Sequence, residues 1–102
     1  MVKLVVIYTE PTDVRAFENH FSEVHTPLVK KMPGIRRLEK TRFTGGPLEP
    51  ARYYLMAAVY FDTRDEMMAA LSSPEGMAVA KDLMSFAAGK AHVMFGEVEQ
   101  IG

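Results

Sequence analysis

The chain has 102 residues and a mass of 11.4 kDa, which is the size of one folded domain. Hydrophobic residues make up 48% and charged residues 25%, which is typical of a packed globular core and excludes a disordered or fibrous chain. A formal net charge of -1 argues against nucleic-acid binding, and the absence of cysteine excludes disulfides, thiolate catalysis and cysteine-ligated metals.

Two apolar runs bear on location. Residues 4–8 are too few for the apolar part of a signal peptide, and no small-residue cleavage site follows them. The longest apolar run, residues 53–61, is about half as long as a membrane-spanning helix. We therefore expect a soluble, cytoplasmic protein that contacts no membrane.

The first half of the chain predicts a strand, a helix and a second strand. Residues 4–8 are β-branched and aromatic, as in a buried strand. Thr12 or Asp13 then caps an amphipathic helix, whose apolar positions are spaced by three and four: Val14, Phe17, Phe21, Val24 and Leu28. Pro27 predicts a break or kink at Thr26, with Thr26 capping a short extension to Lys31. The charged stretch 35–43 predicts an edge strand or a strand that lines a polar cavity.

The second half repeats this order of strand, helix and strand. Residues 53–61 have no polar face and predict a strand buried on both sides. Thr63 and Glu66 form a capping box that begins a helix through Leu71. Ser73 and Pro74 then restart a helix, for which we expect a buried face of Met77, Ala80, Met84 and Ala87. Residues 92–101 alternate as a last strand.

The order strand, helix, strand, strand, helix, strand predicts a single α+β domain over residues 1–102. Two such halves form the ferredoxin-like βαββαβ arrangement, with a four-stranded antiparallel sheet and both helices on one face. The other face would then expose apolar residues of the 53–61 strand. We therefore expect a homodimer in which two sheets cover one another.

The histidines are the first candidates for chemistry. His20 and His25 fall on opposite edges of the predicted apolar stripe and are five residues apart, whereas helical zinc-binding pairs are four apart, so we expect no metal site. His25 lies beside the predicted helix break and could act as an acid or base. The alternative is a structural histidine bonded to a freed carbonyl. We expect His20 at the surface.

Aromatic side chains are the second candidates. A pocket with phenolic hydroxyls as its few polar groups could be lined by Tyr8, Phe43, Tyr53, Tyr54, Tyr60 and Phe95. The alternative is that they form the core and the dimer interface. No glycine-rich phosphate loop and no nucleophile elbow is present, which argues against nucleotide binding and serine-hydrolase chemistry.

Two stretches resemble the EthD family. One is residues 17–37, with His25-Thr26-Pro27 leading to Pro33-Gly34, and the other is residues 71–76, followed by Asp82-Leu83 and Phe86. The resemblance implies a dimeric α+β barrel, in which two ferredoxin-like subunits pack sheet to sheet around a cavity. It also implies that His25, in the family's His-x-Pro motif, faces the cavity. The asparagine that often precedes the last-helix phenylalanine in the family is Ser85 here.

These observations lead to three functional hypotheses. The first is a small enzyme or accessory protein without a cofactor, acting on a hydrophobic or aromatic small molecule in the barrel cavity, with His25 as acid or base. The resemblance links it to catabolism, of the ether-degradation type, or to secondary metabolism. The second is a binding or carrier module without chemistry. The third is haem binding through His25.

Overall fold

The computed structural model describes residues 1–102. Its elements are β1 (Val2–Tyr8), one continuous helix made of α1 (Val14–His20), η1 (Phe21–His25) and α2 (Thr26–Lys30), then β2 (Arg37–Arg42), β3 (Leu55–Phe61), α3 (Arg64–Ser72), α4 (Pro74–Phe86) and β4 (Ala91–Glu97). The sheet order is β2-β3-β1-β4, with every neighbouring pair antiparallel. This is the predicted ferredoxin-like α+β fold, and β2 is the edge strand that its charges indicated. No helix has the length and apolar character needed to cross a membrane.

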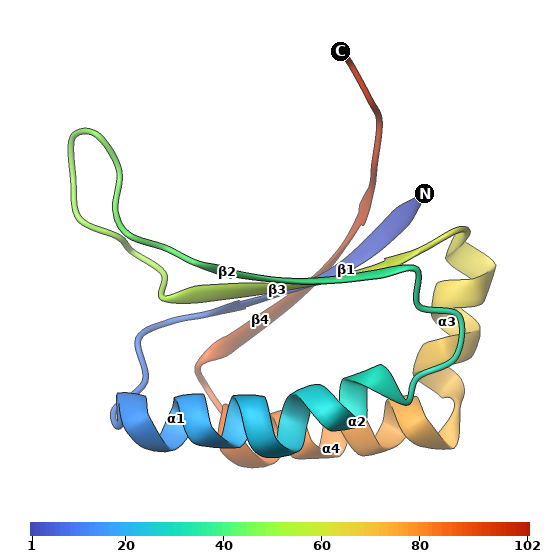
Figure 1. Cartoon of the computed structure of the whole chain (residues 1–102), viewed down its shortest axis with the longest axis horizontal. Coiled ribbons are helices and arrows are strands. Elements are labelled where there is room, and N and C mark those ends of the chain that lie inside the picture. The colour runs from blue at the N-terminus through green and yellow to red at the C-terminus, as the bar shows by residue number, and fades with distance from the viewer.

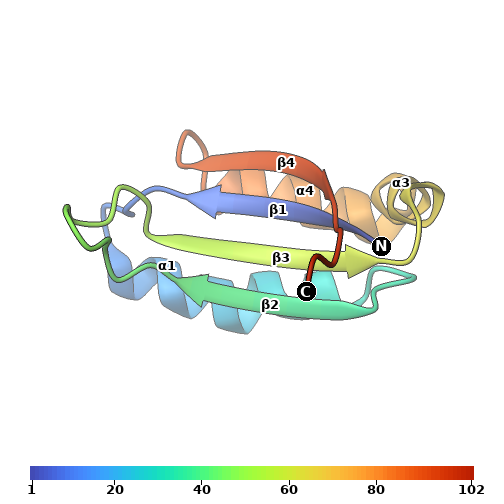
Figure 2. The same ribbon diagram turned by 90° about the horizontal axis from the view of Figure 1, so that it is seen from above.

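The helices form one layer against one face of the sheet (Figure 1). Figure 2 shows the opposite face of the sheet uncovered, with the segment α1–α2 and α4 side by side beneath it. Alternation along the strands divides the side chains between the two faces. Leu4 and Val59 pack in a core cluster with Val29 of α2, and Val6 and Tyr8 in a second cluster.

The open face carries an apolar strip through the two central strands. The register pairs Val5 with Ala58 and Ile7 with Met56, and these positions alternate with those that face the helices. Beyond β4 the chain leaves the sheet: the Val98 amide donates to the Met1 carbonyl at 2.9 Å, and the terminal residues rise from this open face (Figure 1). No helix covers this strip, although Val5 and Ala58 are only 9% and 1% exposed in the single chain.

Side-chain caps begin the helices as predicted. Asp13 accepts from the Ala16 amide at 3.0 Å, Thr63 from the Glu66 amide at 3.1 Å, and Ser73 from the Gly76 amide at 3.1 Å. The corner between α3 and α4 is so sharp that a Cβ at position 76 would lie 2.1 Å from the Ala70 carbonyl oxygen. Only glycine fits there.

The predicted buried face of α4 was wrong for its methionines, whereas Ala87 is buried as predicted. Met77 and Met84 are 64% and 71% exposed, and the helix instead turns Val79, Leu83 and Phe86 inward. The tight corner is the physical reason, because position 76 must face α3 and this fixes the rotation of the helix. The strands are also shorter than the predicted ranges 35–43, 53–61 and 92–101, since the chain leaves the ladder at their ends.

Two partly exposed ion pairs join the first helix to the edge strand β2. The Glu18 carboxylate accepts from the Lys40 ammonium at 2.8 Å and from Arg42 at 3.1 Å, both on β2, and from the Tyr54 hydroxyl. Burial opposes ionisation of Glu18, but these hydrogen bonds outweigh it and lower the pKa from its ordinary 4.5 to about 2. The carboxylate therefore stabilises the fold in its ionised form.

We expect Glu18→Gln to make the protein less acid-sensitive. A carboxyl with a lowered folded pKa stabilises fully above its unfolded value, and this contribution is lost as pH falls from about 4.5 towards about 2. Urea unfolding at several pH values should show the variant less stable at pH 7, with the difference shrinking through this window. The exposed Glu10→Gln is the control. A difference that stays constant with pH would contradict the prediction.

Candidate functional site

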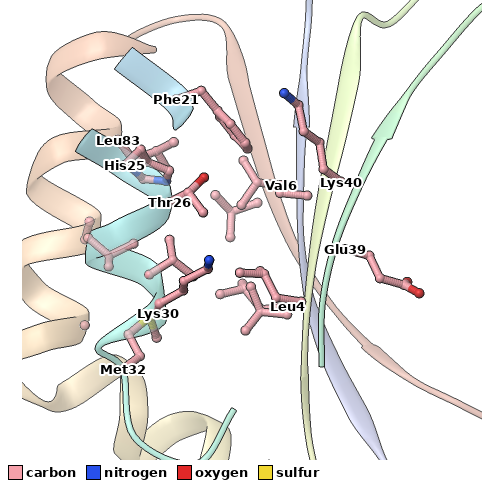
Figure 3. Close-up of a pocket in the computed structure, with 18 of the residues that line it drawn as sticks. Leu4, Val6, Phe21, His25, Thr26, Lys30, Met32, Glu39, Lys40 and Leu83 are labelled. Carbon is pink, nitrogen blue, oxygen red and sulfur yellow. The ribbon is translucent and has the colours of Figure 1, made fainter. Parts of the chain in front are cut away.

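A largely apolar cavity of about 600 Å³ lies between the helix layer and the sheet (Figure 3). Fifteen of its 22 lining residues are hydrophobic. The lining residues come from all four strands and from η1, α2, α3 and α4. This volume is within the range of small-molecule sites, roughly 300 to 1,000 Å³. The sequence placed the cavity between two subunits, but here it is formed within one chain, on the helix side of the sheet.

His25 reaches this cavity because the first helix contains a π-turn. The Thr26 amide donates to the Phe21 carbonyl, five residues back, so η1 contains one residue more per turn than an α-helix. Pro27 gives the reason, since it has no N–H to donate and its ring would press on the carbonyl four residues earlier. Of the predicted break or kink, the break with recapping by Thr26 was wrong: the helix widens locally and continues through α2 without a side-chain cap.

The extra residue changes which side chains are buried. The buried face runs Phe17, Phe21, His25 and Val29 at intervals of four, whereas the predicted stripe continued through Val24, which is 42% exposed. His25 takes the inward place that α-helical geometry would give to an aliphatic side chain and is 4% exposed. The same turn brings residues 20 and 25 onto one side of the helix.

The two histidines meet on one carboxylate of α4. His25 Nδ1 lies 2.9 Å from Asp82 Oδ2, and His20 Nε2 lies 2.9 Å from Oδ1 and 3.0 Å from Oδ2. The expectation that His20 and His25 lie on opposite edges was thus wrong, for the same reason. No group of three or more His, Cys, Asp or Glu side chains is arranged to hold a metal ion.

The carboxylate fixes the tautomer of His25. Burial opposes ionisation of Asp82, but hydrogen bonds from His25 and His20 outweigh it and lower its pKa. An ionised carboxylate only accepts hydrogen bonds, so His25 carries its proton on Nδ1 and its lone pair on Nε2. Asp82 therefore orients the ring and leaves Nε2 as the basic nitrogen.

His25 Nε2 opens onto the cavity. It makes no hydrogen bond within the protein, yet the only unpaired side-chain N or O atom sealed from water is the Tyr8 hydroxyl. Since His25 lines the cavity, the access of Nε2 is through it. The Thr26 hydroxyl is also without a partner, and Figure 3 shows it directed into the same space. The cavity thus has the His25 base and the unpaired Thr26 hydroxyl among its few polar groups.

Burial is the main cause that lowers the pKa of His25 below its ordinary 6.5. The hydrogen bond and charge of Asp82 oppose this change, and the charge of His20 adds to it. His25 is consequently neutral at neutral pH, the form in which Nε2 can accept a proton.

Aromatic rings hold the imidazoles in place. The Phe86 ring centroid lies 4.6 Å from that of His20 and 4.8 Å from that of His25. Tyr8 packs edge-on to Phe17 and Phe21 behind them, and burial, with the nearby Asp82 charge, raises the pKa of its phenol. The Tyr8 hydroxyl therefore stays protonated and has no partner.

The structure divides the six predicted ligand residues. Tyr8 and Phe95 line the cavity with His25. Tyr60 lies on the open face of the sheet, where its hydroxyl donates to Glu39 at 2.9 Å, and Tyr54 donates to Glu18 outside the cavity. Phe43 and Tyr53 lie at the two ends of the loop between β2 and β3, and neither residue lines the cavity. Ligand contact by any of the six stays a prediction.

Sequence reasoning missed three residues of the site: His20, Thr26 and Asp82. Asp82 had a visible signal, since it lies three residues after Val79 and four before Phe86, so a carboxylate interrupts an apolar face of the helix. The prediction that the methionines of α4 face inward placed Asp82 on the wrong side of the helix. His20 and Thr26 had no such signal, because their directions depend on the π-turn.

The fold and site define a ferredoxin-like α+β protein with a histidine-containing cavity under its sheet. The EthD domain model matches residues 9–90, and the chain belongs to the EthD family. It is 38% identical to an EthD family protein of Bacillus halodurans, with a TM-score of 0.93 over 97% of this chain and 99% of that one. It is 32% identical to an uncharacterized 11.0 kDa protein from the thcB-thcC intergenic region of Rhodococcus erythropolis, over 99% of this chain and 98% of the relative.

More distant structures share the fold alone. SnoaB, a cofactor-independent oxygenase from Streptomyces nogalater, is 18% identical with a TM-score of 0.72, over 98% of this chain and 94% of that one. A dimeric protein of unknown function from Bacteroides fragilis is 24% identical with a TM-score of 0.64, over 95% of each chain.

We expect Asp82→Asn to lower the pKa of His25 further and His20→Gln to raise it. The first change removes the charge that favours the imidazolium but keeps a hydrogen-bonding oxygen, and the second removes a repelling cation. NMR titration of the histidine ring signals measures both. His92→Gln, on exposed β4, is the matched control and should leave the His25 titration unchanged. A His25 pKa that is unchanged or raised in Asp82→Asn would contradict the shared-carboxylate arrangement.

Proposed function

We propose that this protein is a small enzyme, or an accessory protein of an enzyme system, that takes a hydrophobic or aromatic molecule into the cavity and moves a proton on it through His25 Nε2. One observation carries the proposal. A neutral, buried imidazole has one nitrogen held by a carboxylate, and the other opens into an apolar cavity of ligand size. A histidine kept only for packing would not need a free nitrogen there.

The geometry supplies the parts of general acid–base catalysis. Nε2 accepts a proton from a C–H or O–H group of the bound molecule, and the resulting imidazolium is stabilised by Asp82, 2.9 Å from Nδ1. The apolar walls exclude water, which strengthens this electrostatic interaction. The Thr26 hydroxyl can donate to an oxygen that gains negative charge as the proton leaves. The imidazolium then returns the proton to the product.

The chemistry uses only the chain's own residues, in line with the expectation of an enzyme without a cofactor. The likeness to SnoaB, a cofactor-independent oxygenase, supports this proposal through the fold alone. Family membership supports a place in catabolism or secondary metabolism. Cytoplasmic location stays a prediction from the sequence.

We also propose that the working form is a homodimer in which the open sheet faces pack together. Ile7 and Met56 of the apolar strip are partly exposed on the face that no helix covers, and a second copy presents the same strip. The C-terminal residues, with Ile101 97% exposed, rise from this face and would extend along the partner. The Bacteroides fragilis neighbour, described as dimeric, supports a dimer through the shared fold alone.

The acid–base proposal is tested on His25. Native mass spectrometry of fresh protein, or a thermal-shift screen of aromatic compounds, first identifies a bound molecule. His25→Gln should then lower turnover of that molecule about 100-fold to 10,000-fold, the usual contribution of such a group, with its Kd changed by less than about threefold. His92→Gln is the control. Wild-type protein that binds the molecule and leaves it unchanged would instead identify a carrier.

The homodimer is tested by light scattering. We expect a mass of about twice 11.4 kDa at micromolar concentration. Ile7→Glu places a charge in the strip and should give a folded monomer, whereas Met77→Glu, on the exposed side of α4, should stay dimeric. A wild-type monomer at micromolar concentration would refute the arrangement.

A further inference from the structure

The charged side chains around the cavity are unequally paired. Three residues of fixed charge line it: Lys30 on α2, and Glu39 and Lys40 on β2. Figure 3 shows Glu39 directed away from the cavity, and its carboxylate is 2.6 Å from Arg37 on the open face of the sheet. Lys40 is on the cavity side, but its ammonium is 2.8 Å from Glu18 and lies over the Phe21 ring. The charges of these two residues are therefore already matched.

Lys30 has no such partner. No carboxylate lies within 4 Å of its ammonium, and it makes no hydrogen bond to the protein. In Figure 3 its side chain extends from α2 into the space between the helices and the sheet, with the nitrogen leading. Lys30 is an exposed residue that lines the cavity, so an anion that enters with the ligand would form a charge-assisted hydrogen bond with its free ammonium.

We propose that the ligand of this cavity is an amphipathic acid: an apolar or aromatic body with one anionic group, a carboxylate or an acidic phenol, that pairs with Lys30. This inference rests on the proposed function, because it concerns the molecule on which His25 acts. Lys30 follows His25 by five residues along the helix, roughly 8 Å at 1.5 Å per residue. The anionic group is consequently at one end of the molecule, and the atom that exchanges a proton with His25 is at the other.

A pair of fluorescent dyes tests the charge separately from the apolar body. N-phenyl-1-naphthylamine is neutral, and 8-anilino-1-naphthalenesulfonate has the same rings with one added sulfonate. We expect both to bind the wild-type dimer, the sulfonate more tightly, with an affinity that falls as NaCl is raised while that of the neutral dye does not. Lys30→Gln should weaken the sulfonate about tenfold, as for loss of a charge-assisted hydrogen bond, and leave the neutral dye unchanged.

Lys31→Gln is the matched control, since Lys31 is the next residue, is exposed and does not line the cavity. It should change neither dye. If Lys30→Gln leaves the preference for the sulfonate intact, or weakens both dyes equally, the anionic-ligand inference is wrong while the proposed function stands.

Cavity-filling variants show whether the dyes are bound at this site. Ala57 of β3 lines the cavity, and Ala57→Phe fills it, with the smaller Ala57→Leu as a second variant should the first fail to fold. Both dyes should lose affinity in the folded variant. Dyes that bind it as tightly as the wild type, or that do not bind the wild type, would overturn the proposed use of the cavity and the inference with it.

Discussion

The π-turn before Pro27 is the feature on which the rest of the site depends. It adds one residue to a turn of the first helix, and that residue changes the inward position from Val24 to His25. Without it, residues 20 and 25 would be about 140° apart around the helix and could not reach the same carboxylate. With it, His20, His25 and Asp82 form one hydrogen-bonded unit. A backbone adjustment at one proline thus brings these three side chains together beside the cavity.

Burial and hydrogen bonding shift the pKa of His25 in opposite directions, and burial is the larger effect. Burial alone would give an uncharged ring with no fixed orientation, and a carboxylate alone would favour the imidazolium. Together they give a neutral ring with Nδ1–H fixed on Asp82 and Nε2 facing apolar space. The second histidine shares the carboxylate from the more exposed side.

The two faces of the sheet serve different purposes. The helix face carries the cavity, while the open face carries an apolar strip edged by the charges of Arg37 and Glu39. This separation means that a second copy could cover the open face without closing the cavity. The charged side chains around the cavity are also separated between the two faces. Glu39 is held on the far side of its strand, and Lys30 has no partner on the near side.

The sequence by itself determined the elements and their order. Caps at Asp13, Thr63 and Ser73 were readable because they are local hydrogen bonds within three residues, and the strands were readable from apolar alternation. That local pattern was also sufficient to predict a ferredoxin-like fold, while a chemical role for His25 stays a prediction.

Only the tertiary structure decided how the side chains meet. Asp82 is 57 residues from His25, so no local pattern joins them, and their contact requires α4 to lie beside the first helix. The rotation of α4 follows from the α3–α4 corner at Gly76, which turned the methionines outward and Asp82 inward. The sequence could not show whether Tyr54 and Tyr60 line the cavity or bind a carboxylate elsewhere. That choice depends on strand register and on the positions of Glu18 and Glu39. Sequence periodicity assumes a regular helix, and here a single wide turn changed every buried position that follows it.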